Sequence, residues 1–153
     1  MDVIRAIEVV PAGTWSLDDA ADHLLLCYDD RYRRRFKYVS DGGAEYMLDL
    51  ARTTLLREGD GLRLEDGRIV AVHAAREALV EATAPAAAML LRFAWHLGNR
   101  HLVAQLDIDR ILIRDDPVIV DMLRGLGAIV RPVRAAFSPE LGAYSGGGHH
   151  HDH

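Results

Sequence analysis

The sequence contains a single cysteine, Cys27, among its 153 residues. One cysteine cannot form a disulfide within the chain, and it cannot supply the paired thiolates of a Cys-x-x-Cys metal site. Cys27 lies in the apolar run at residues 24–28, where we expect it to be a small core residue. Any metal bound by this protein would therefore be held by histidine and carboxylate side chains.

The chain also lacks any apolar run of the roughly 18 residues that a membrane-spanning helix needs, so we expect no membrane partner. Its first residues show neither the basic start nor the apolar stretch of a secretory signal peptide. We therefore expect a cytoplasmic protein.

Excess positive charge is absent as well: the formal net charge is −5, whereas a general nucleic-acid binder usually has a basic surface. The basic and aromatic run at residues 31–38 is compatible with contacts to phosphates and bases. The acidic balance and the lack of a second such run favour a solvated strand edge or a protein-binding face. We predict no nucleic-acid partner.

Catalytic motifs are missing too, including His-Glu-x-x-His, Gly-x-Ser-x-Gly, the P-loop and Gly-x-Gly-x-x-Gly. A catalytic metal normally has about three protein ligands and one open position, and no single ordered segment offers three. We predict that the protein is not an enzyme. A metal-dependent hydrolase remains the alternative, and turnover by the purified protein alone would favour it.

Short strand-like runs separated by turn residues fill the first half of the chain. Two hairpins are predicted, because the steps Asp41-Gly42 and Asp66-Gly67 supply the positive φ angles of tight turns. Residues 18–28 are compatible with one face of a helix or with a strand at residues 22–28, and we favour the strand. The composition, 50% hydrophobic and 27% charged, is that of a globular chain. We predict an all-β domain over residues 1–75.

The second half alternates strands with helices in the order βαββαβ, which is that of a ferredoxin-like domain. Thr83 and Pro85 are expected to start its first helix, residues 86–97, and Gly98-Asn99 to end it. Asp116-Pro117 caps and opens the second helix, which Gly125 and Gly127 stop. The predicted strands are residues 78–82, 102–106, 110–114 and 128–133.

The predicted fold class is therefore α+β, in three parts. The all-β domain is followed by the ferredoxin-like domain at residues 76–136, and then by a loop and flexible His-containing tail at residues 137–153. In the first helix only Arg92 and His96 are polar, so we expect it to be buried on more than one side. In a domain this small, the second side would face a partner subunit.

Histidine is the compositional anomaly, since four of eight lie in the last five positions: His149, His150, His151 and His153. Imidazole is a ligand for nickel, copper and zinc. His101 stands alone between the first helix and the next strand, and one histidine cannot hold a metal tightly. A two-fold dimer would bring two copies together, and the tail on its glycine tether would complete the site.

These histidines also have structural interpretations, which are alternatives to metal binding. A single histidine at a helix–strand junction is often structural, and a terminal histidine cluster can be an expression tag, although Asp152 interrupts this one. We expect His23, His73 and His96 to be structural or surface residues. Asp116 is expected to be a helix cap and Asp115 its solvated neighbour.

Several segments together resemble the UreE family of urease accessory proteins. The most specific is His-Leu-Gly-Asn-Arg-His at residues 96–101, followed by Gln105. Residues 121–127 and 137–144 resemble the family's second-helix segment and the segment before its His-rich tail. In the first half the looser matches are Leu55, Gly59-Asp60 and Asp66-Gly67-Arg68.

The resemblance implies a cytoplasmic homodimer that acts as a nickel metallochaperone and delivers Ni(II) to urease. It implies partners in the urease accessory GTPase (UreG) and the urease apoprotein–accessory complex. The first domain would contact partners, and the second would dimerise and bind metal through His101 of both subunits. The tail histidines would supply further ligands.

The sequence departs from the family pattern at one place. Some members carry His-Asp-His before the second helix, where this chain has Asp115-Asp116-Pro117, so a second histidine site is not expected there. Two alternatives to nickel delivery remain at this point: a Zn(II) or Cu(II) carrier or sensor on the same scaffold, and a regulatory ferredoxin-like module that binds no metal.

Overall fold

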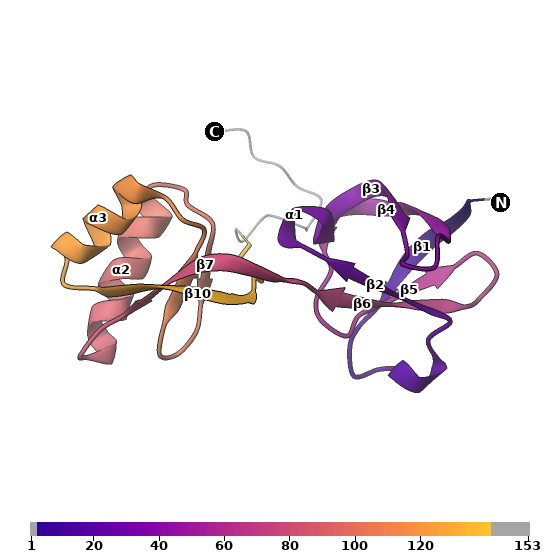
Figure 1. Cartoon of the computed structure of the whole chain (residues 1–153), viewed down its shortest axis with the longest axis horizontal. Coiled ribbons are helices and arrows are strands. Elements are labelled where there is room, and N and C mark those ends of the chain that lie inside the picture. The colour runs from indigo at the N-terminus through magenta and orange to yellow at the C-terminus, as the bar shows by residue number, and fades with distance from the viewer. Residues whose placement is uncertain (1–2, 142–153) are drawn as a thin grey trace. The chain divides into compact units, whose positions relative to one another are not determined.

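A computed structural model describes residues 3–141 of the chain. The chain divides into two compact units, which meet between Ala75 and Arg76, and both are drawn in Figure 1. Within the described residues, no helix has the length and apolar character that crossing a membrane requires.

The first unit is a strongly curved six-stranded sheet with the strand order β2-β6-β5-β1-β4-β3. Strands β1 and β4 are parallel, as are β2 and β6, and the remaining pairs are antiparallel. Its elements are β1 (Ile4–Val10), a 3-10 turn (Leu17–Asp19), β2 (Asp22–Leu26), α1 (Tyr28–Arg31), β3 (Tyr32–Val39), β4 (Glu45–Leu55), β5 (Gly61–Leu64) and β6 (Ile69–Ala74).

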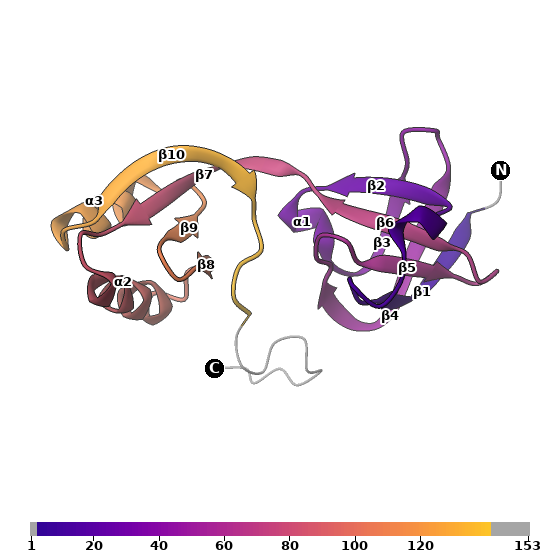
Figure 2. The same ribbon diagram turned by 90° about the horizontal axis from the view of Figure 1, so that it is seen from below.

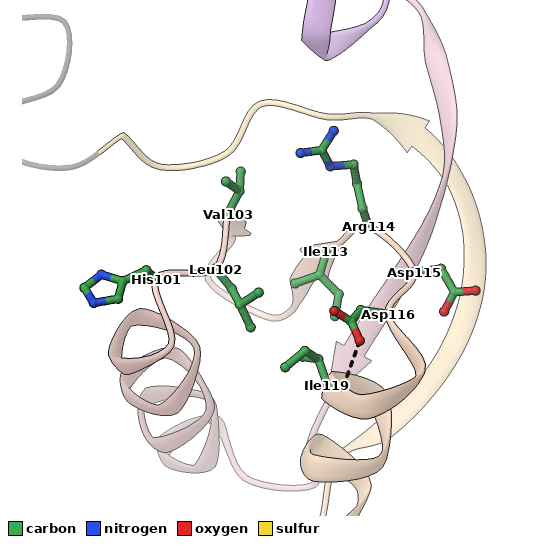
Figure 3. A pocket seen from close by; sticks show the side chains of 8 residues that line it. All are labelled: His101, Leu102, Val103, Ile113, Arg114, Asp115, Asp116 and Ile119. Atoms are coloured by element: carbon green, nitrogen blue, oxygen red, sulfur yellow. Dashed lines mark hydrogen bonds between the residues drawn. The ribbon is translucent and has the colours of Figure 1, made fainter.

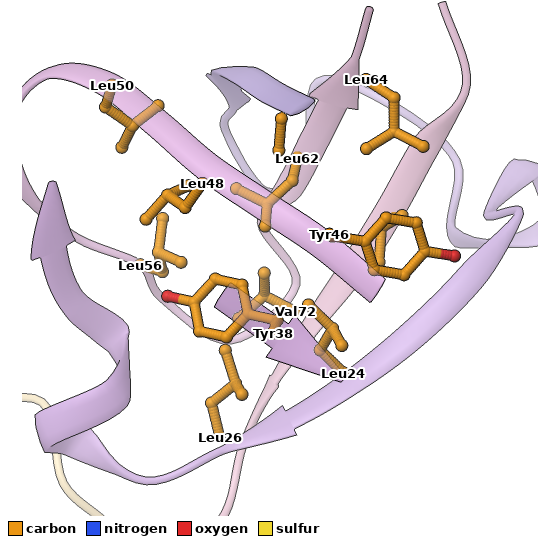
Figure 4. Packing of buried hydrophobic residues seen from close by; sticks show 12 residues of the cluster. Leu24, Leu26, Tyr38, Tyr46, Leu48, Leu50, Leu56, Leu62, Leu64 and Val72 are labelled. Atoms are coloured by element: carbon orange, nitrogen blue, oxygen red, sulfur yellow. The ribbon is translucent and has the colours of Figure 1, made fainter. Parts of the chain in front are cut away.

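Alternating side chains of these strands fill one core, which Figure 4 shows around Tyr38, Leu48 and Leu62. The all-β prediction and both hairpins are confirmed. Gly67 adopts the positive φ of 90° expected of its turn, whereas in the first hairpin the positive φ, 87°, belongs to Gly43 and not to the predicted step Asp41-Gly42. Cys27 was expected in the core, yet it is only half-buried, because the strand ends at Leu26 and Cys27 precedes α1.

The second unit has a four-stranded antiparallel sheet in the order β10-β7-β9-β8, with two helices (Figure 2). Its elements are β7 (Arg76–Thr83), α2 (Ala87–Asn99), β8 (Ala104–Leu106), β9 (Ile111–Ile113), α3 (Pro117–Gly125) and β10 (Ile129–Ala136). The order βαββαβ and the sheet topology confirm the ferredoxin-like prediction.

Both helices pack on one face of this sheet. Leu90, Phe93 and Leu97 of α2 share a core with Ile119 and Leu123 of α3. The other face carries Glu81, whose buried carboxylate accepts hydrogen bonds from Arg131 (2.7 Å) and Arg110 (3.1 Å).

The two helices begin differently. The predicted start of α3 is confirmed: Asp116 accepts hydrogen bonds from the backbone N–H groups of Val118 (3.1 Å) and Ile119 (3.4 Å). The predicted start of α2 is wrong, because Ala86 is its N-cap and makes no side-chain cap bond. Thr83 instead ends β7, where it pairs with Ile129 of β10.

Candidate metal centre

The end of α2 places His101 in an unusual backbone conformation. The N–H of Leu102 bonds the carbonyl of Leu97 (3.1 Å), and the N–H of His101 bonds that of Gly98 (3.0 Å). This pair of bonds defines a Schellman motif, in which the residue after the C-cap is left-handed and is usually glycine. Here it is His101, with φ 56°, the single non-glycine residue with positive φ among those the structure describes.

α2 ends at Asn99, as predicted, but the left-handed residue is His101 and not Gly98 or Asn99, which both lie within the helix. Leu97 is buried, and Leu102 packs against the same core. A hydrophobic contact between these two positions commonly accompanies a Schellman motif, and here it fixes where α2 ends. A left-handed residue with a Cβ costs about 1 kcal/mol relative to glycine. Histidine tolerates this region better than most residues, and such strain is concentrated at functional sites.

The imidazole of His101 is exposed at the rim of a cleft of about 270 Å³, which Asp115 and Asp116 also line. Figure 3 shows its ring directed away from both carboxylates. Asp116 is engaged as the cap of α3, and Asp115 is exposed. Across residues 3–141, no three His, Cys, Asp or Glu side chains gather into a metal-holding group. Within one chain, the described residues therefore do not gather a complete ligand set around His101.

The tail histidines His149, His150, His151 and His153 lie outside the described residues, as does the predicted glycine tether from residue 145 onward. The last described residues, 137–141, lie beside the strand that follows His101. The N–H of Glu140 bonds the carbonyl of Ala104 (2.9 Å), and that of Ser138 bonds Oε1 of Gln105 (2.9 Å). Phe137 is fully buried. Residues 137–141 therefore dock on the second unit.

One face of α2 is apolar and uncovered. Leu91 and Trp95, four residues apart and thus on the same side of the helix, are 75% and 65% exposed. His96 packs edge-on against Trp95, with 5.0 Å between the ring centroids. The expected second buried side of α2 is consequently an exposed side in the single chain.

The basic run at residues 31–38 has structural roles. Arg31 is fully buried and donates to the carbonyl of Leu56 (3.0 Å). Arg35 pairs with Asp49 (3.1 Å), and Lys37 pairs with Glu45 (3.1 Å), both across β3 and β4. These charges are partly neutralised within the sheet, which fits the predicted solvated strand.

Sequence reasoning missed a side-chain cluster in the first unit. Nδ1 of His23 lies 2.9 Å from Nε2 of His73, whose Nδ1 lies 3.0 Å from a carboxylate oxygen of Glu58. The residues are far apart in sequence and meet because β2 pairs with β6 in parallel. The alternating apolar pattern predicts which side chains of a strand face the core, but it does not predict which strands lie next to each other.

Fold and site together define a protein with an all-β unit and a ferredoxin-like unit that presents one exposed histidine. Its sequence matches the family models of the UreE urease accessory protein, the N-terminal domain over residues 3–75 and the C-terminal domain over residues 77–153.

Individual relatives agree along nearly the whole chain. It is 47% identical over 152 residues to the urease accessory protein UreE of Beijerinckia indica subsp. indica. That alignment covers 99% of this chain and 87% of the Beijerinckia protein. The chain is 47% identical over 150 residues to the urease accessory protein UreE of Rhodobacter capsulatus, with 96% and 92% covered. For Chelativorans sp. the values are 48% over 160 residues, with 99% of each covered. The chain belongs to the UreE family of urease accessory proteins.

Proposed function

We propose that this protein is a nickel metallochaperone, which binds Ni(II) as cargo and delivers it during maturation of the urease active site. His101 from two subunits forms an interface site, and histidines of the C-terminal tail complete it. The observation that carries this proposal is an exposed histidine held in a left-handed conformation at the end of an apolar, uncovered helix.

The exposed surface of α2 supports the proposed dimer. Leu91 and Trp95 present a large apolar area to water, and such patches mark interaction sites. A second copy of the same face is the simplest complement, because a two-fold interface needs only one self-complementary surface. His101 follows α2 directly, so two copies of α2 packed on an axis would bring two imidazoles near it.

Two imidazoles on an axis make an open site that is suited to a carrier. Neutral imidazole is a good ligand for nickel, and two ligands leave coordination positions for the tail. The chain from Leu141 to His149 is eight residues long, which spans up to about 28 Å when extended. Because residues 137–141 dock beside β8, that reach is measured from close to His101.

Ordering the tail on metal binding opposes complex formation through lost chain entropy. The resulting affinity is lower than that of a fully preformed site, which allows release to the next protein. The carrier works in the cytoplasm with the accessory GTPase (UreG) and the urease apoprotein–accessory complex, and the first unit provides the partner-binding surface. It catalyses no reaction itself.

Calorimetric titration of the full chain with Ni(II) tests this proposal. We expect one tightly bound Ni(II) per dimer, and we expect His101→Asn to abolish that binding, since asparagine tolerates the left-handed backbone but carries no imidazole. His96→Asn is the matched control and should bind as the parent does. Undiminished high-affinity binding in His101→Asn would reject the interface site.

The role of the tail is tested separately. Replacing His149, His150, His151 and His153 by asparagine should weaken Ni(II) binding and lower urease activation in a reconstituted system. A regulatory module that binds no metal predicts that neither measurement changes.

A further inference from the structure

A second group of imidazoles lies on the outer face of the first unit's sheet. His23 is the second residue of β2, an edge strand, and His73 is near the end of β6. The parallel register pairs His23 with Ala71 and Leu25 with His73. The two histidines therefore stand diagonally on the same face, while Leu24 and Val72 point into the core.

The hydrogen bonds of the pair fix its protons. A carboxylate oxygen can only accept, so Nδ1 of His73 carries the hydrogen that bonds Glu58 (3.0 Å). In a neutral His73, Nε2 is then the acceptor, and Nδ1 of His23 donates to it (2.9 Å). Glu58 is held in turn, since its other oxygen accepts the backbone N–H of Ala74 (2.9 Å).

This arrangement is that of an oriented metal ligand. Metal-binding histidines generally donate their second ring N–H to a carboxylate, which fixes the ring and raises its basicity. Glu58 provides that contact for His73. Two nitrogens at right angles around an ion, each about 2.1 Å from it, are separated by about 3.0 Å. The two facing nitrogens already stand at such a separation, so binding would need rotation of the rings and no movement of the strands.

We propose that His23 and His73 form a second divalent-metal site, which takes nickel or another imidazole-binding cation through Nδ1 of His23 and Nε2 of His73. The ion replaces the hydrogen between the rings. That proton leaves Nδ1 of His23, and Nε2 of the same ring takes one up from water, so both imidazoles stay neutral. His73 keeps its bond to Glu58.

Water fills the remaining coordination positions, because within the described residues no third ligating side chain joins the pair. Because His23 is exposed on the edge strand β2 and His73 is half-buried on the adjacent β6, such a site is open to solvent and suits rapid loading and release of an ion. It shares no residue with the His101 site and does not depend on the proposed function, so either can fail alone.

The test uses the full-length chain in which His101 is replaced by glycine and the four tail histidines by asparagine. Titration of this background with Ni²⁺ should give one ion per chain. Adding His23→Asn or His73→Asn should abolish binding, and Glu58→Gln should weaken it by about 10–100-fold. His96→Asn is the matched control and should change nothing.

A background chain that binds no Ni²⁺ would overturn the proposal, as would binding that survives both His23→Asn and His73→Asn. A second readout guards against misfolded variants. In the unsubstituted background chain, paramagnetic Ni²⁺ should broaden NMR signals around residues 23 and 73 first, and broadening centred on His96 would contradict the assignment.

Discussion

The two helices of the ferredoxin-like unit lie on the same sheet face and end with the same hydrogen-bond pattern, yet they differ where it matters for function. At the end of α3, the N–H of Gly127 bonds Arg124 (3.0 Å) and that of Ala128 bonds Leu123 (2.9 Å). The left-handed residue there is Gly127, with φ 99°. At the equivalent position after α2 stands His101.

Glycine at the end of α3 satisfies both backbone and space, because a Cβ at Gly127 would lie 3.0 Å from Cε of Met89. At position 101 the side chain is exposed, so glycine would relieve only the left-handed backbone strain. The exposed faces also differ: α3 presents the ion pair Asp121–Arg124 and one apolar residue, Val118, whereas α2 presents the two large apolar side chains Leu91 and Trp95. Under the proposed function, α3 serves the fold, whereas α2 and the residue that follows it would serve a partner subunit and a metal ion.

The largest effect is expected from a charge on the apolar face of α2. Leu91→Asp should dissociate the proposed dimer, because a carboxylate would have to be desolvated in the interface, while the folding of the single chain is little affected. Sedimentation velocity would measure the dimer. Val118→Asp is the matched control, since Val118 on α3 is 69% exposed. Equal dissociation by both variants would remove the distinction between the helices.

Placing a histidine at the end of α3 should destabilise the fold. Gly127→His adds left-handed strain and a contact with Met89, and we expect a loss of about 2–4 kcal/mol in the free energy of unfolding. Urea denaturation would measure it. Gly98→Ala is the control: no atom crowds that position, and alanine should stabilise α2 by about 0.5–1 kcal/mol. A tolerated Gly127→His would show that the two helix ends are interchangeable.

If metal binding and fold stability are separable, a substitution that lowers stability away from His101 should leave metal binding unchanged. Glu81 allows this test, because it lies on the sheet face that the helices do not cover. Glu81→Gln removes the charge shared by Arg131 and Arg110, which should cost about 1–2 kcal/mol. Nickel stoichiometry at neutral pH should be unchanged. A simultaneous loss of nickel binding would tie the site to global stability.

The same residue has a pH signature. The hydrogen bond from Arg131, opposed by burial and assisted by Arg110, holds the pKa of Glu81 below its ordinary value. Its contribution to stability is therefore complete above the unfolded-state pKa of about 4.3, and it disappears as the pH falls through the lower folded-state pKa. Urea midpoints of the parent and of Glu81→Gln should converge as the pH falls through that acidic range.

The smallest effect on stability, and the most specific, is expected from His101→Gly. Glycine relieves the left-handed strain, so the free energy of unfolding should rise by about 1 kcal/mol. His101→Ala keeps the strain and should show no such gain. Both should lose the proposed interface nickel. A glycine variant that is less stable than the parent would mean that the imidazole supports the fold.

How far the sequence predicts this molecule depends on whether a feature is local. The cap of α3 is local, because Asp116 bonds N–H groups two and three residues away. The start of α2 is not: Thr83 has the chemistry of a cap, but pairing with β10 draws it into β7. The end of α2 depends on where Leu97 and Leu102 pack into the core. The sequence does not give that position, and Gly98 suggests an earlier end of the helix.

The site divides in the same way. His101 stands out in the sequence as a lone histidine within a family-like motif, but its left-handed backbone follows from tertiary packing. The pairing of His23 with His73 depends on the parallel register of β2 and β6. Fifty residues separate these histidines, and no local pattern links them.

A crystal structure of the nickel-loaded dimer tests the central claim most directly, through its anomalous difference map at the nickel edge. We expect a peak at the two-fold axis, about 2.1 Å from an imidazole nitrogen of His101 in both subunits. Nickel density that avoids the axis while the two His101 side chains remain apart would contradict it.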